Sequence, residues 1–175
     1  MEEKTDYRMV TCMFPDRESA ERAFEAVSSR GYSKDDVNVV MSDETRDKHF
    51  GHTTIKTELG NKALKGAGTG SAIGTTLGAI AGAVAAIGTN LVLPGLGLIV
   101  AGPLAAALAG AGAGAATGGL IGALIGSGIP EERAKIYEDG IKKGNIVLGF
   151  HPRNREDAEY VANEWRLHHG LELHR

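Results

Sequence analysis

The 175-residue chain lacks charge over a long internal run, has one cysteine and carries no basic cluster. No charged side chain occurs from Gly66 to Pro130, a run of 65 residues between Lys65 and Glu131. The lone Cys12 cannot form an internal disulfide. With a net charge of −3 and no basic run, nothing favours nucleic-acid binding. The charged N-terminus lacks an apolar core, so we expect no signal peptide.

The charge-free run consists largely of glycine and alanine, with 18 and 17 residues. Residues four apart lie on one helix face, so glycines at that spacing leave a groove where another backbone can approach. Each glycine costs a helix about 1 kcal/mol relative to alanine, so close packing must compensate. We therefore predict a glycine zipper whose packing and assembly residues form two series: Gly66, Gly70, Gly74, Gly78 and Gly82, then Gly110, Gly114, Gly118, Gly122 and Gly126.

Two helices, at about 66–89 and 103–127, would carry these series. The segment Leu91–Gly102 contains chain-breaking Pro and Gly residues, so we expect it to be the turn of an antiparallel hairpin. A helix of about 24 residues is roughly 36 Å long, enough to cross a bilayer core of about 30 Å. The sequence thus predicts a helical hairpin with its turn deepest in, or across, a membrane.

Membrane insertion of one helix alone is marginal. Its five bulky aliphatic residues contribute roughly −1.5 to −3 kcal/mol, against several threonines and many glycines. Two environments therefore stay open, a membrane and a water-soluble assembly in which hairpins bury one another. The basic residues that flank the hairpin place both flanks on the cytoplasmic side of the inner membrane, or in the cytoplasm for the soluble alternative: Lys56, Lys62, Lys65, Arg133 and Lys135.

The flanks predict one α+β domain of the ferredoxin-like βαβ-βαβ order. Each contributes a strand, a helix and a second strand, and their helical sequences resemble one another. We expect strands at 7–14, 37–41, 145–150 and 171–174, helices after Pro15 and Asn154, a loop at 42–64 and a connecting helix at 131–143. Residues 1–59 and 131–175 would form this sandwich, with the Gly/Ala-rich hairpin, 60–130, inserted between strands two and three.

One face of the predicted sheet is a possible interface. Val10, Cys12 and Phe14 point to the helix-covered face, which makes Cys12 a buried core residue. The opposite face carries Met9, Thr11, Met13, Val147 and His151. If the helix at 131–143 leaves them exposed, they can bind a partner; the alternative is that this helix covers them.

No residue pattern predicts catalysis, a cofactor or a metal. The Gly-x-Gly starts at Gly66 and Gly110 lack the third glycine and the Lys-Ser/Thr ending of phosphate-binding loops. His49 and His52 lie among acidic residues, and three histidines cluster near the C-terminus, but solvated side chains are the simpler interpretation. We expect no catalytic, cofactor-binding or metal-binding residue.

Two parts of the chain resemble a known family. The first strand and helix, with Phe14, Ala20, Ala23 and Gly31, resemble the bacterial heat-induced general stress protein family. The segments 93–103 and 122–140, the second containing Gly-Ile-Pro-Glu-Glu, are similar to glycine-zipper proteins often grouped with it. The resemblance implies a stress-associated bacterial protein and supplies no catalytic residue.

These patterns together predict a non-enzymatic, self-associating stress-response protein with a membrane-associated glycine-zipper hairpin. Its partners would be copies of itself and membrane lipid. One alternative is a soluble homo-oligomer or filament assembled through the hairpins. Another is a small-ligand sensor, which a pocket between subunits lined by His151 and Met13 would favour.

Overall fold

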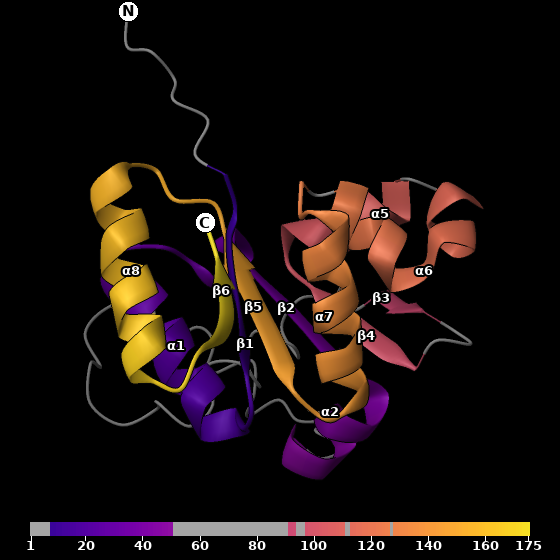
Figure 1. Ribbon diagram of the computed structural model, residues 1–175, viewed down its shortest axis with the longest axis horizontal. Coiled ribbons are helices and arrows are strands. Elements are labelled where there is room, and N and C mark those ends of the chain that lie inside the picture. The colour runs from indigo at the N-terminus through magenta and orange to yellow at the C-terminus, as the bar shows by residue number, and fades with distance from the viewer. Residues whose placement is uncertain (1–7, 51–90, 94–96, 111–112, 127) are drawn as a thin grey trace, which may run out of the picture.

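The computed structural model describes residues 8–50, 91–93, 97–110, 113–126 and 128–175 (Figure 1). These residues form three layers, with an antiparallel sheet between two groups of helices (Figure 1). The six strands lie in the order β3-β4-β2-β5-β1-β6. Their bounds are Val10–Phe14 for β1, Val37–Ser42 for β2, Leu91–Leu93 for β3, Leu98–Ala101 for β4, Ile146–Phe150 for β5 and Leu171–His174 for β6.

The helices divide between the two faces of this sheet. Helices α1 and α8 cover one face, and α5, α6 and α7 lie on the other (Figure 1). The described helices are α1 (Arg17–Ser29), the 3₁₀ turn Lys34–Asp36, α2 (Asp43–Phe50), α5 (Pro103–Gly110), α6 (Ala113–Gly126), α7 (Glu131–Lys142) and α8 (Arg155–Leu167). The mixed α+β class is therefore shown.

The core beneath α1 and α8 is aromatic. Trp165 of α8 contacts Phe14 of β1 and Phe150 of β5 edge to face, with ring centroids 5.7 Å apart in each pair. Its indole Nε1 donates a hydrogen bond of 2.9 Å to the carbonyl of Ala23 in α1. Val10, Cys12 and Phe14 of β1 point into this core, as the alternation of side chains predicts.

The core on the other face is aliphatic and depends on close backbone approach. Leu120 and Leu124 of α6 pack with Tyr137 and Ile141 of α7. A Cβ placed on Gly140 of α7 would lie 1.9 Å from the Met13 sulfur, so the absence of a side chain at this glycine leaves room for the Met13 side chain beneath α7.

The elements predicted from the two flanks are confirmed. All four strands, α1, α7 and α8 occur within a few residues of the expected bounds. Asp16 and Asn154 begin α1 and α8 in the same way, because each side chain accepts a hydrogen bond from the third helical N–H. The predicted loop 42–64 is wrong at its start, because α2 occupies Asp43–Phe50.

The predicted hairpin turn is wrong. Leu91–Leu93 and Leu98–Ala101 are strands instead, and β4 pairs with β2 from Ser42↔Leu98 to Val39↔Ala101. Gly102 makes this possible, since a Cβ there would lie 2.2 Å from the Val37 carbonyl oxygen. Its φ of 92° is also a conformation that favours glycine. The expected tip of the hairpin therefore lies on the sheet.

The predicted single helix at 103–127 is also wrong. It is divided into α5 and α6, and Gly119 within α6 has the non-helical dihedrals φ 57° and ψ −156°. The other predicted helix, 66–89, lies outside the described residues, as do Gly66, Gly70, Gly74, Gly78 and Gly82. Among the helices that are described, none is long and apolar enough to cross a membrane.

Candidate functional site

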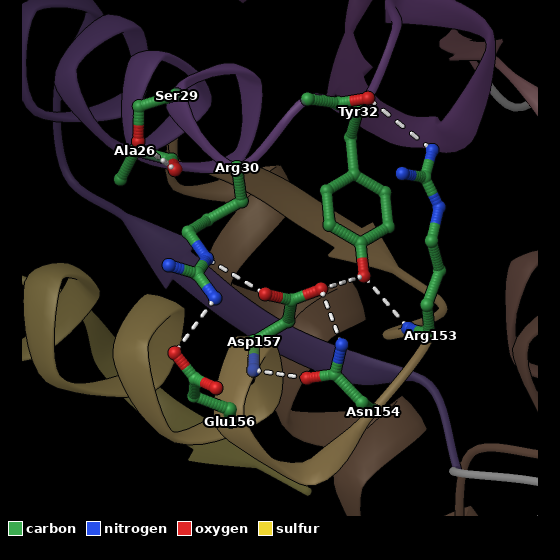
Figure 2. Close-up of polar contacts among 9 residues, drawn as sticks. Ala26, Ser29, Arg30, Tyr32, Arg153, Asn154, Glu156 and Asp157 are labelled. Atoms are coloured by element: carbon green, nitrogen blue, oxygen red, sulfur yellow. Dashed lines mark hydrogen bonds and ion pairs between the residues drawn. The ribbon is translucent and has the colours of Figure 1, made fainter.

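A polar network joins the two halves of the chain at the end of α1 and the start of α8. Its centre is Asp157, which is 5% exposed (Figure 2). One carboxylate oxygen accepts a hydrogen bond of 2.7 Å from Nε of Arg30. The other accepts hydrogen bonds of 2.8 Å from the Tyr32 hydroxyl and 3.2 Å from the Asn154 amide. Both oxygens are therefore occupied by donors.

Tyr32 extends this network to the loop before α8. Its hydroxyl accepts a hydrogen bond of 2.7 Å from the backbone N–H of Arg153. The Arg153 guanidinium lies over the Tyr32 ring, 4.2 Å from the centroid, and donates to the Gly31 carbonyl (Figure 2). A buried aromatic side chain thus places its one polar atom between two partners.

The charges of this network are complementary. Burial acts to raise the pKa of Asp157, but the hydrogen bonds from Tyr32 and Arg30 outweigh it and hold the pKa below its ordinary value. Burial raises the pKa of Tyr32. A carboxylate that is ionised and has both oxygens occupied stabilises the fold; it is poorly placed to transfer a proton to a substrate.

The buried side chains of Cys12 and Tyr137 are also held in structural positions. Burial raises the pKa of the Cys12 thiol to about 12, and its sulfur donates to the Leu171 carbonyl at 3.2 Å. The Tyr137 hydroxyl donates to the Glu172 carbonyl at 2.7 Å and lies 2.9 Å from the Thr11 hydroxyl. Burial raises the pKa of Tyr137 as well. The thiol is therefore protonated at neutral pH, and Cys12 is the buried core residue that the sequence predicts.

Of the two alternatives left open for the face of β1 and β5, the structure shows the covered one, so the possible exposed interface is not formed there. Helix α7 covers that face, so the four non-histidine side chains are at most 6% exposed: Met9, Thr11, Met13 and Val147. His151 alone among the five stays exposed, beyond the end of β5. Met13 and His151 are thereby separated, one beneath α7 and the other in solvent.

The described part of the second glycine series lies on an open surface. Gly118, Gly122 and Gly126 of α6 are exposed, and a Cβ at any of them would meet no described atom within 4 Å. The opposite side of α6 carries the buried Leu120 and Leu124. The surroundings of Gly110 and Gly114 lie outside what the structure describes, so the zipper as a whole stays a prediction.

Among the described residues, the histidines form no cluster with several acidic residues, although His168 lies 3.6 Å from the Glu164 carboxylate. Across those residues, no group of three or more His, Cys, Asp or Glu side chains lies close enough to hold a metal ion. His49 lies in α2, and His52 is outside the described residues. Burial, followed by the charges of Arg133 and Arg8, lowers the pKa of His174.

Asn38 is a structural residue that the sequence patterns did not identify. It is 4% exposed near the start of β2, where its Oδ1 accepts a hydrogen bond of 2.7 Å from the N–H of Leu104. It thereby satisfies a free N–H in the first turn of α5. Its position among apolar residues of β2 could have identified it from the sequence, because a buried amide side chain needs a hydrogen-bond partner.

Because comparison with known proteins gave no match, any proposal about function rests on the sequence and on the geometry described above. No family model, curated protein or solved structure matches the chain. The resemblance to the general stress protein family therefore stays a prediction.

Proposed function

We propose that this protein is a non-enzymatic, self-associating protein of the bacterial stress response that assembles through α6. The observation that carries the proposal is the exposed row formed by Gly122 and Gly126 on one face of α6; Gly118, which is also exposed, precedes the break at Gly119. A second helix can approach this row to backbone distance, which turns the unfavourable helix propensity of glycine into close packing. The proposed role in the stress response rests on the family resemblance alone.

The proposal that the protein is not an enzyme is supported by the buried reactive side chains, which are hydrogen-bonded within the fold. Asp157 is held by Arg30 and Tyr32, Cys12 is a buried protonated thiol, and Tyr137 is bound to Glu172. Each of these groups stabilises the fold through its present partners. We propose cytoplasmic localisation for the assembly.

Membrane association, on the cytoplasmic side of the inner membrane, is a second candidate function. The charge-free run from Gly66 to Pro130 and the 41% exposure of Ile125 favour it. The burial of Leu120 and Leu124 against the α7 layer favours assembly instead, because the aliphatic side of α6 is already covered within the chain. The partner in one proposal is another copy, and in the other it is lipid.

We also propose that the strands from the two chain ends form a ferredoxin-like βαβ-βαβ sandwich. Without β3 and β4, the strand order is β2-β5-β1-β6, and this supports the proposal. The complete sheet differs from a simple ferredoxin-like sheet because β3 and β4 extend it beyond β2.

The decisive variant is Gly122→Gln, which adds bulk without adding an apolar surface. We expect the wild-type protein to form a discrete oligomer in light scattering, and Gly122→Gln to reduce its average mass toward the monomer. Ser28→Gln, on the exposed side of α1, is the matched control and should leave the mass unchanged. Wild-type protein that stays monomeric at high concentration would contradict assembly. Recovery in the membrane pellet after an alkaline wash would favour the second candidate.

A further inference from the structure

Helix α7 presents an outer face that carries charges of both signs in a defined order. It buries Ala134, Tyr137, Gly140 and Ile141 toward the sheet. The side chains on its opposite face are exposed, and from the N-terminal to the C-terminal end they are Glu132, Lys135, Ile136, Asp139 and Lys143. The face is therefore acidic where the helix begins and basic where it ends.

The two end charges are available for a partner. Glu132 and Lys143 form no ion pair among the described residues, and they lie eleven positions apart, roughly 16 Å along the helix. If α7 of a second copy packs antiparallel on this face, Glu132 meets Lys143 of the second copy. The two copies are then related by a two-fold axis, so the same pair occurs a second time. A parallel arrangement would bring like charges together, so the pattern selects the antiparallel one.

The middle of the face fits the same arrangement. The two-fold axis falls between residues 137 and 138, so Ile136, which is 40% exposed, lies close to the axis. Lys135 then lies beside Asp139 of the second copy. The pairs that α7 already makes along its own surface are Lys135 with Glu131, both exposed, and Lys142 with the half-buried Glu138. Surface ion pairs of this kind contribute at most about 1 kcal/mol, so they are a small obstacle to new pairs across an interface.

We propose that α7 is the symmetric contact between two copies of this chain, paired antiparallel through this outer face. The inference rests on the proposed self-association and specifies its geometry. The α7 pair determines orientation and register, while the adjacent α6, which packs against α7, carries the exposed glycines. An interface of this kind is isologous, so each residue contact occurs twice.

Charge reversal tests the pairing on the full-length protein. Glu132→Lys and Lys143→Glu should each raise the dimer dissociation constant about tenfold, measured by sedimentation equilibrium at low salt, because each creates two like-charge contacts. The double variant should restore the dissociation constant to within about threefold of wild type, because the pair is regenerated with its charges exchanged. Glu25→Lys, exposed on α1, is the control for net charge and should have no effect.

Each outcome decides the proposal. The α7 pairing would be overturned if the single variants had the dissociation constant of the wild type. It would also be overturned if the losses of binding free energy in the two single variants simply added up in the double variant. If Gly122→Gln still prevents assembly in that event, self-association through α6 stands and only its geometry is refuted. A wild-type protein that never dimerises refutes both. Far-UV circular dichroism on every variant checks that these exposed substitutions leave the fold intact.

Discussion

The two helical layers on this sheet are stabilised by different means. Helices α1 and α8 have a side-chain cap at their N-termini, an aromatic core and a charged network between them. Helices α5 and α6 have no charged residue, and their packing requires Gly102 to contact the β2 backbone. The first layer is specified by large side chains, and the second depends on their absence. Substitutions should therefore act in opposite ways in the two layers.

Truncation should have its largest effect in the aromatic layer. We expect Trp165→Ala to lower the free energy of unfolding by about 3–5 kcal/mol, because it leaves a cavity beside Phe14 and Phe150. Leu167→Ala, two residues later and 72% exposed, should change it by less than about 0.5 kcal/mol. Urea denaturation measures both. Equal losses would mean that α8 does not form this core.

Enlargement should have the larger effect in the α7 layer. Gly140→Ala places a methyl group on the Met13 sulfur, so this buried thioether must shift; because methionine is flexible and alanine favours the helix, we expect a net loss of about 1–2 kcal/mol in the free energy of unfolding. Met13→Ala should lose stability by itself through its cavity, yet the double variant should lose less than the sum of the two. Additive losses in a double-mutant cycle would show that the two positions do not touch.

The charged network should make the first layer sensitive to pH. Tyr32→Phe removes a hydrogen bond to Asp157, so we expect a loss of about 1–2 kcal/mol at neutral pH. Because the folded-state pKa of Asp157 is lowered, the network stabilises the fold above the ordinary aspartate pKa of about 3.9, and this contribution is lost as pH falls through the folded value. The difference between variant and wild type should therefore shrink below about pH 4, as measured by denaturation at several pH values. A difference that is constant with pH would contradict this.

The smallest effect should come from filling the open surface of α6. Alanine at position 122 meets no described atom and favours the helix by up to about 1 kcal/mol, so we expect Gly122→Ala to be neutral or slightly stabilising in the monomer. Thermal unfolding at low protein concentration measures this. A clear loss of stability would show that the glycine row is packed within the chain.

The flanks were predictable because their patterns are local. Alternation in β1 separates Cys12 and Phe14 from Met13, and Asp16 and Asn154 cap helices within three residues. The Asp157 network was not predicted, although Asn154 and Asp157 have capping spacing. Its partners Arg30 and Tyr32 lie more than 120 residues away, and nothing local relates them.

The sequence by itself determined the four strands and the helices α1, α7 and α8 of the two flanks, the buried cysteine and the four-residue spacing of Gly118, Gly122 and Gly126. Only the tertiary structure decided that Leu98–Ala101 joins β2, that α5 and α6 are separate helices, and that α7 covers Met9 and Met13. The physical reason is that a Gly/Ala-rich segment has weak preferences of its own. Its conformation follows the surface on which it packs, and Val37 and Asn38 of β2 supply part of that surface from elsewhere in the chain.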